Sequence, residues 1–114
     1  MIDNHPSIKT ALETVLPTYY ELKLHKGIQT PCISYQETNN YTEQDGDTFG
    51  YSRLTYTVKV WGNRLEDLQR YSIAIDAVLR PLGYKRISSG ELHDNNSTMI
   101  QKIMTFEALA MEEY

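Results

Sequence analysis

The sequence predicts an α+β fold: a mainly antiparallel sheet of four to five strands, with two helices packed on one face. Two patterns carry this prediction. Apolar and polar residues alternate through residues 51–60, which is typical of a strand with one buried face. Apolar residues then recur at helical spacing from Leu65 to Leu82, so a helix follows at once. Further alternating segments and turn-type residues give the order α-β-β-loop-β-α-β-β, and strands joined by turns favour antiparallel pairing.

The first element is a helix, which we expect over residues 3–16. Pro6 suits the first helical turn, where its missing N–H group has no consequence, and Pro17 ends the helix. One apolar stripe at helical spacing marks the face that we expect to be buried: Ile8, Ala11, Leu12, Val15 and Leu16.

Two short strands and a long loop follow. Alternation over residues 19–24, with Tyr20, Leu22 and Leu24 on one face, predicts the first strand, and Lys26-Gly27 offers a turn. Pro31 opens the second strand, which we expect to end near Glu37 and to lie at a sheet edge, because proline cannot donate to a ladder. Residues 38–50 are almost entirely polar, so we predict a long flexible loop that orders on assembly.

The third strand and the second helix form the most distinct unit of the chain. The strand stops at Trp61-Gly62. Asn63 can accept hydrogen bonds from the free amides of a helix start, and Glu66 three residues later completes a capping-box pattern. Gly83 closes the helix, because glycine tolerates the left-handed conformation common at helix ends.

The C-terminal part predicts two more strands. The first covers residues 84–92, residues 94–97 form a turn, and the last strand runs over residues 99–110. We expect residues 111–114 to be a loose tail. Since the sequence shows no linker or internal repeat, we interpret residues 1–114 as a single domain.

Composition excludes several function classes. The formal net charge is −4 at pH 7, and Lys85-Arg86 is the only adjacent basic pair, which argues against binding nucleic acid by phosphate neutralisation. The single cysteine, Cys32, excludes an intrachain disulfide, and its apolar strand favours a core residue over a reactive thiol. The first residues lack a basic and apolar leader, and no apolar run reaches 18 residues, so we expect neither a signal peptide nor a membrane span.

The sequence lacks the usual catalytic and metal-binding patterns. His5, His25 and His93 do not have the spacing of zinc ligands, and the acidic run at 43–47 lacks the terminal glutamate of a calcium loop. Ser88-Ser89-Gly90 does not form a nucleophile elbow, and the sequence has no glycine-rich phosphate loop. We therefore predict a protein that is not an enzyme and uses no cofactor or metal.

Several segments share their order and lengths with one family. The first helix leads through Leu16-Pro17 into Tyr19-Tyr20-Glu21, and Thr-Pro-Cys-Ile-Ser-Tyr follows at 30–35. After the polar stretch come Leu-Thr-Tyr-Thr-Val-Lys-Val-Trp-Gly at 54–62, Ile-Ala-Ile-Asp-Ala-Val-Leu at 73–79 and Thr-Phe-Glu-Ala-Leu-Ala at 105–110. Over nearly its whole length the chain thus resembles the tail terminator, or tail-completion, proteins of long-tailed bacteriophages.

The resemblance implies a structural virion protein. Members of this family form a ring, typically a hexamer, that caps the head-proximal end of the tail tube, ends tube growth and offers a surface for head–tail joining. The implied partners are copies of the chain itself, the major tail tube protein and the head–neck connector proteins, while DNA passes through the channel without specific binding. The implied location is the virion tail, after assembly in the host cytoplasm. The family has no catalytic residue to carry over.

Subunits that meet head to tail in a ring need two different surfaces that fit each other. Basic and aromatic residues are our candidates for the subunit or tube interface: Arg53, Lys59, Trp61, Tyr41 and Phe49. Acidic residues of the predicted loop are our candidates for the opposite surface or for the channel lumen: Glu43, Asp45 and Asp47. Arg53 and Lys59 also fit a solvated strand face, and Trp61 also fits packing under the helix. The acidic group also fits a solvated loop.

Two other functions stay open. A neck or head-completion adaptor belongs to the same part of a virion, although such proteins are often rich in helices and this chain is rich in strands. A small soluble module that binds a peptide or regulator on an open sheet edge belongs to a different class.

Overall fold

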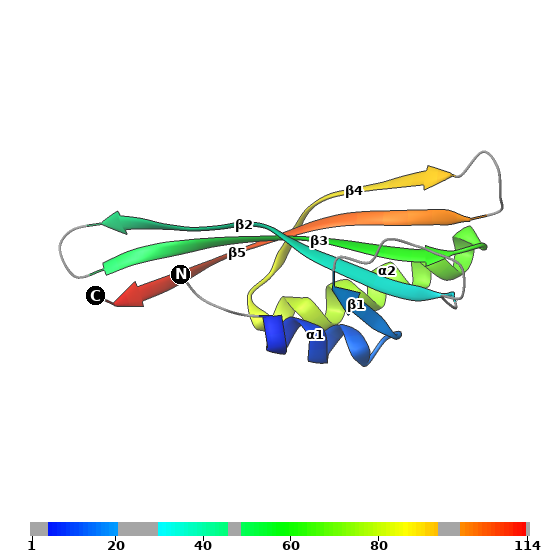
Figure 1. Ribbon diagram of the computed structural model, residues 1–114, viewed down its shortest axis with the longest axis horizontal. Coiled ribbons are helices and arrows are strands. Elements are labelled where there is room, and N and C mark those ends of the chain that lie inside the picture. The colour runs from blue at the N-terminus through cyan, green and yellow to red at the C-terminus, as the bar shows by residue number, and fades with distance from the viewer. Residues whose placement is uncertain (1–4, 21–29, 46–48, 94–98, 114) are drawn as a thin grey trace.

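The computed structural model describes residues 5–20, 30–45, 49–93 and 99–113, and it confirms the predicted α+β class. Figure 1 shows a long twisted sheet with both helices on one side of it. In chain order the elements are α1 (His5–Glu13), β1 (Thr18–Tyr20), β2 (Cys32–Asp45), β3 (Phe49–Gly62), α2 (Leu65–Leu79), the short 3-10 helix η1 (Arg80–Leu82), β4 (Lys85–His93) and β5 (Ile100–Glu113).

The five strands form one sheet in the order β1-β2-β3-β5-β4. All neighbours pair antiparallel except β1 and β2, which are parallel. The turn expected at Lys26-Gly27 lies outside the described residues, but the antiparallel pairing that it implied is wrong. Residues 21–31 separate the two strands, and a parallel connection needs about a dozen residues. The edge position expected for the strand after Pro31 is also wrong, because β1 covers β2 between Ile33 and Tyr35.

The two helices bury one face of the sheet. Buried positions alternate along β3, where Leu54, Tyr56, Val58 and Val60 each expose 1% or less of their surface. The helices meet this face with Ile8 and Leu12 of α1 and with Leu68, Ile75 and Leu79 of α2, so the predicted stripe of the first helix is confirmed. Burial of these apolar side chains is the main favourable contribution to folding.

A row of tyrosine rings crosses this core. The ring centroids of Tyr20 and Tyr35 lie 5.1 Å apart, those of Tyr35 and Tyr56 6.3 Å, and those of Tyr56 and Tyr84 5.8 Å. The last three rings are almost fully buried, and the hydroxyl of Tyr56 donates a 2.8 Å hydrogen bond to Oε2 of Glu37. At least part of the tyrosine surplus therefore stabilises the subunit itself.

The predicted loop over residues 38–50 is wrong for every one of its residues that the structure describes. Residues 38–45 continue β2 and residues 49–50 begin β3, in a register that runs from Cys32 opposite Trp61 to Asp45 opposite Phe49. A shift in register between Glu37 and Asn39 marks the point where the pattern changes. The polar composition of these residues predicted a loop. They form strands nevertheless, because backbone pairing in a projecting ladder does not require alternating apolar residues.

The same difference occurs at the C-terminus. The loose tail expected over 111–114 is wrong for residues 111–113, which belong to β5 and pair with residues 49–51 of β3. We call the projecting three-strand ladder formed by residues 41–45, 49–53 and 109–113 the arm. Figure 1 shows that the arm extends away from both helices, and the whole molecule measures 53 × 24 × 22 Å.

The start of α2 depends on close packing rather than on the predicted cap. The N-cap residue is Arg64, which has extended backbone angles and makes no side-chain capping bond, so the capping box assigned to Asn63 and Glu66 is wrong. The strand instead passes directly under the helix: a Cβ atom added to Gly62 would lie 2.9 Å from Cδ2 of Leu68. At the other end Gly83 takes the left-handed conformation, with φ 91°, as predicted.

Candidate assembly surfaces

The face of the sheet opposite the helices carries the first predicted interface residues. Arg53 and Lys59 lie on this face of β3 and are both partly exposed. Nη1 of Arg53 lies 2.6 Å from Oε1 of Glu107 on β5, so its charge is at least partly used within the subunit. Lys59 has no ion-pair partner within the part of the chain that the structure describes. Of the two, Lys59 is the residue whose charge is available to a partner.

Trp61 is buried, with 7% of its surface exposed, on the same face as Lys59. Its Nε1 donates a 2.9 Å hydrogen bond to Oγ of Ser34, which is itself buried, and its strand neighbour is Cys32. This arrangement supports packing within the subunit over a role as an interface anchor. The sequence offered packing of Trp61 under the helix as an alternative. In the structure Trp61 instead lies on the sheet face opposite the core face of Val58 and Val60.

The remaining predicted interface residues lie in the arm. Tyr41 and Phe49 are paired with Arg53 and Asp45 respectively, and Glu43 and Asp45 occupy the end of β2. Asp47 lies outside the described residues. The register of β5 adds two acids that the sequence did not associate with this group, because Glu113 lies opposite Phe49 and Glu112 opposite Gly50.

The acidic tip is therefore a feature of the sheet, not of one loop. We use this name for Glu43, Asp45, Glu112 and Glu113, which the register of β2, β3 and β5 brings to one end of the arm. The sequence has no lysine or arginine within residues 38–52 or 108–114. Each strand of the arm thus ends in a region with only negative or neutral side chains.

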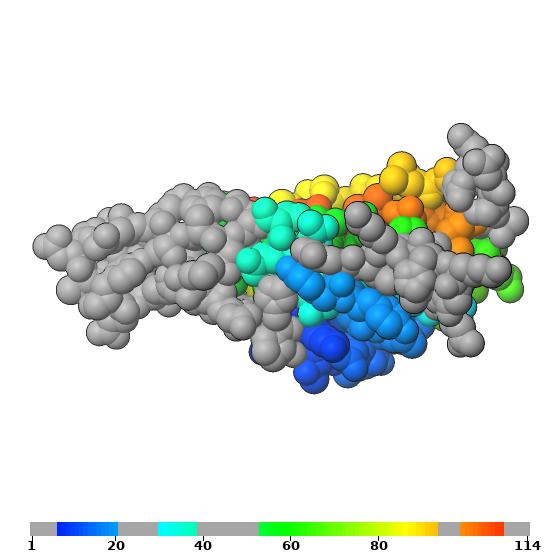
Figure 2. Space-filling view, in the orientation of Figure 1, coloured from blue at the N-terminus to red at the C-terminus, as the bar shows by residue number. Residues whose placement is uncertain are grey.

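Strand β4 forms an open edge of the sheet. Within the described residues β4 pairs only with β5, and all nine of its residues are exposed. Ile87 and Leu92 expose 51% and 55% of their surface, which is high for large apolar side chains. In Figure 2, β4 runs along the upper rim of the described surface, with β5 beside it. An open strand with exposed apolar residues is a ready template for another chain.

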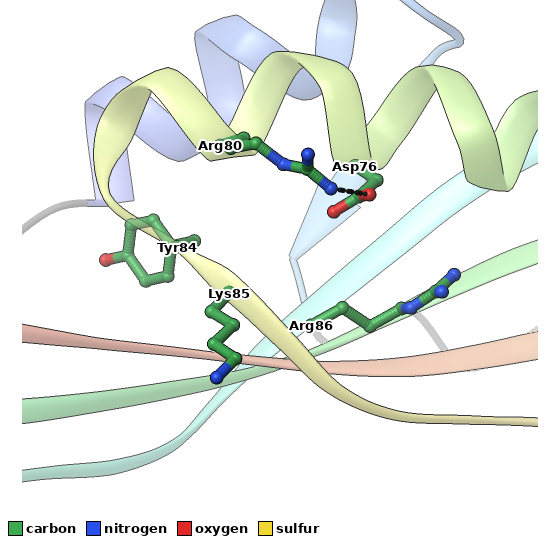
Figure 3. Close-up of a pocket in the computed structure, with 5 residues that line it drawn as sticks. All are labelled: Asp76, Arg80, Tyr84, Lys85 and Arg86. Atoms are coloured by element: carbon green, nitrogen blue, oxygen red, sulfur yellow. Dashed lines mark hydrogen bonds and ion pairs between the residues drawn. The ribbon is translucent and has the colours of Figure 1, made fainter.

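A cleft of about 380 Å³ lies where α2 ends and β4 begins. Figure 3 shows Asp76 and Arg80 on the helical side and Tyr84, Lys85 and Arg86 on the strand side. Nη2 of Arg80 lies 2.6 Å from Oδ2 of Asp76. Neither Lys85 nor Arg86 has an ion-pair partner within the described part of the chain. Figure 3 shows the ammonium group of Lys85 pointing away from Asp76 and Arg80, so Arg80 and Arg86 are the cations on the helix side of the cleft, which we call the basic cleft.

The structure offers little support for chemistry at these surfaces. Among the described residues, no three His, Cys, Asp or Glu side chains gather as metal ligands do. Cys32 is buried, and its burial raises the pKa of the thiol, so the reactive thiolate is disfavoured. No helix in the described part of the chain is long and apolar enough to cross a membrane.

Comparison with known proteins gives a likeness in fold. Neither the protein-family models nor the curated proteins give a match to this sequence. One solved chain superposes over most of the molecule. It belongs to the structure described as "Virion of native gene transfer agent (GTA) particle" and aligns with a TM-score of 0.67, covering 92% of this chain and 84% of that chain. The two sequences are 10% identical, so the likeness concerns the fold.

The sequence reasoning missed most of the charged residues that now form a pattern. Lys85-Arg86 stands out in the sequence as the only adjacent basic pair, but nothing in the sequence places it beside a cleft with Arg80. The sequence predicts a loose tail for Glu112 and Glu113, whereas both residues belong to β5. The sequence does hold one signal for a longer last strand. The apolar residues of the segment at 99–110 continue to Met111, directly before Glu112 and Glu113.

Proposed function

We propose that this protein is a structural virion component that forms a ring, a hexamer, on the head-proximal end of a phage tail tube. The ring ends tube growth, provides the head–tail joining surface and leaves a channel for DNA. The observation that carries this proposal is the fold shared with a chain of a gene transfer agent virion over 92% of this chain.

The surfaces support assembly in a ring. A head-to-tail contact uses two different patches on each copy. This chain presents an open edge strand on one side of the sheet and, on its long axis, an arm with a uniformly acidic tip. These are different surfaces, as a closed ring requires.

The proposed partners follow from the position of the ring. Copies of the chain itself form the ring, the major tail tube protein lies below it, and the head–neck connector proteins lie above it. The net charge of −4 suits a channel through which DNA moves without binding, because like charges repel. No enzymatic step is part of this proposal.

Tail length in assembled particles tests the proposed function. In the phage or phage-like element that encodes the chain, we expect loss of the gene to give tails of irregular, extended length and heads without tails in negative-stain electron microscopy. Supplying the intact gene in trans is the control and restores normal particles. Normal tail lengths and normal joining without the gene would contradict the proposal.

The open edge of β4 also favours the second candidate, a module that binds a peptide as an added strand. Mass photometry of the purified chain, with and without tail tubes, separates the two. A ring, formed alone or on tubes, supports the terminator. A chain that stays monomeric on tubes and binds short peptides along β4 supports the module.

A further inference from the structure

Strand β4 begins with two adjacent cations that lie on opposite faces of the sheet. Arg86 lies opposite Phe106 of β5, whose side chain is fully buried on the helix side. Lys85 lies opposite Glu107, which pairs with Arg53 on the other face. In Figure 3 the side chains of Lys85 and Arg86 accordingly leave the strand in different directions. The open edge of β4 therefore has one cation on each side of it, as consecutive residues of a strand provide.

The carboxylates beside these two cations are engaged by other residues. On the face opposite the helices, Oε1 of Glu107 lies 2.6 Å from Nη1 of Arg53. On the helix side, Oδ2 of Asp76 lies 2.6 Å from Nη2 of Arg80. The two cations at the start of β4 are exposed, and neither has an ion-pair partner among the residues that the structure describes. A partner from outside the subunit would have to supply the matching negative charge.

The other end of β4 has a different character. The carboxylate of Glu91 accepts a 3.3 Å hydrogen bond from Nζ of Lys102, so its charge is used within the subunit. Leu92 exposes 55% of its surface and lies opposite Gln101, on the same sheet face as Lys85. The available charge of β4 is thus positive and lies at the start of the strand, while the end of the strand offers an apolar side chain.

The backbone of β4 can accept a further strand. Among the described strands β4 pairs only with β5, all nine of its residues are exposed, and its sequence has no proline. A register shift between Arg86 and Ser88 marks a bulge, and β5 pairs with β4 on both sides of it. Charged residues and bulges can protect an edge strand, but exposed apolar residues such as Ile87 and Leu92 do not. The combination therefore favours a selective edge over a blocked one.

We propose that β4 binds an extended segment of another protein, which pairs antiparallel with it and carries two consecutive acidic residues. Opposite Arg86 and Lys85, these two residues point to opposite faces of the sheet, so each meets one cation. The register of β5 gives the spacing of the remaining contact: Gln101, opposite Leu92, lies five positions before the residue opposite Arg86. An apolar residue at that spacing before the first acid packs on Leu92. The inference rests on the second candidate function above, which takes β4 as the binding edge, and it does not depend on the ring.

The two parts of this site have different roles. Backbone hydrogen bonds along an added strand supply affinity, and side chains in register supply specificity. The pair of cations fixes the register, because a shift of one residue moves every side chain of the added strand to the other face. Two copies of β4 do not fit each other in this way, since Glu91 is the only acid of the strand and Lys102 engages it. The matching strand therefore comes from a different protein.

Peptide binding to the full chain tests the site. The probe is a fluorescent peptide, Thr-Ile-Thr-Val-Thr-Val-Glu-Glu, and its control ends in Lys-Lys instead. We expect the acidic peptide to bind about tenfold more tightly by fluorescence anisotropy, although the net charge of −4 attracts the control. Lys85→Glu with Arg86→Glu should reverse this preference, and Lys9→Glu on α1 should leave it unchanged. Equal affinities of the native chain for the two peptides would overturn the proposal.

Methylation of peptide amides separates strand pairing from a contact made by charge alone. Every second amide of an added strand faces its partner, so the acidic peptide is prepared in two versions, N-methylated at odd or at even positions. We expect one version to lose binding and the other to bind like the parent peptide. Equal binding of the two versions would overturn the pairing with β4.

The outcomes also separate this inference from the functions proposed above. If peptides bind with the alternating methylation pattern but without a preference for acids, the inference fails and the second candidate function stands. If no peptide binds, both fail, and the ring is unaffected. Circular dichroism shows whether each variant is folded, and the two peptides on the native chain decide the matter where a variant is not.

Discussion

The indole Nε1 of Trp61 donates a 2.9 Å hydrogen bond to Oγ of Ser34 on the sheet face that lies opposite the helices. Both residues are buried, although no described helix packs on that face. The bond joins β2 to β3 between residues two positions apart in their register, since Ser34 lies opposite Lys59 and Trp61 lies opposite Cys32. It gives this face of the sheet a specific polar contact between two strands.

Removing the serine hydroxyl should destabilise the fold. We expect Ser34→Ala to lower the free energy of unfolding by about 1–3 kcal/mol, because the buried indole N–H group loses its partner. In the double variant with Trp61→Phe, the serine change should cost less, because no donor is left unsatisfied. Urea denaturation of the native chain, the two single variants and the double variant measures both costs in free energy of unfolding. Equal costs of Ser34→Ala in both backgrounds would contradict the assigned bond.

The close approach of β3 to α2 should make Gly62 intolerant of substitution. A Cβ atom at this position would lie 2.9 Å from Cδ2 of Leu68, which is fully buried and has little room to move. We expect Gly62→Ala to cost about 1–3 kcal/mol of stability by overpacking. Thermal and urea unfolding measure the loss.

Gly90 provides the matched control for that substitution. It also lies in a strand, but a Cβ atom there would meet no heavy atom within 4 Å. Gly90→Ala should therefore change stability by no more than about 0.5 kcal/mol. A Gly62→Ala chain as stable as the Gly90→Ala chain would show that α2 does not pack tightly on the end of β3.

Burial of Cys32 should make the stability of the fold depend on pH in the alkaline range. Burial raises the pKa of its thiol above the ordinary value of 9.0, so the folded state holds its proton more tightly than the unfolded state does. Stability is unaffected well below that value and falls as pH rises above about 9, where the unfolded thiol ionises. We expect the stability of the native chain to fall faster than that of Cys32→Ala between pH 8 and 10.5. Parallel slopes for the two chains in urea denaturation would contradict this.

Much of the fold could be predicted from the sequence because it follows from apolar periodicity. The alternation through Leu54 and Val60 places β3, and the helical spacing of Leu68 and Leu79 places the buried face of α2. Such patterns arise wherever an element has one buried side and one exposed side. The two helices and the core face of the sheet meet this condition.

The arm could not be predicted in the same way. Residues 38–45 and 111–113 form strands through backbone pairing with β3, and backbone pairing leaves no apolar signature in the sequence. The acidic tip was missed for the same reason: Glu43 and Glu113 are 70 positions apart, and only the strand register brings them to one end of the sheet. The basic cleft likewise depends on how η1 turns the chain from Arg80 to Lys85.

The ion pair between Arg53 and Glu107 decides whether Arg53 belongs to the subunit or to an interface. Its atoms lie 2.6 Å apart, and the two side chains are 34% and 26% exposed. We expect Glu107→Gln to lower the stability of the isolated chain by about 1 kcal/mol, because it weakens a charge-assisted hydrogen bond in a partly desolvated site. Glu66→Gln is the control: its pair with Arg64 spans 3.9 Å between side chains that are 88% and 68% exposed, and such pairs contribute about 0–1 kcal/mol. Urea denaturation under conditions where the chain is monomeric measures both. A Glu107→Gln chain as stable as the Glu66→Gln chain would return Arg53 to the candidates for the subunit interface.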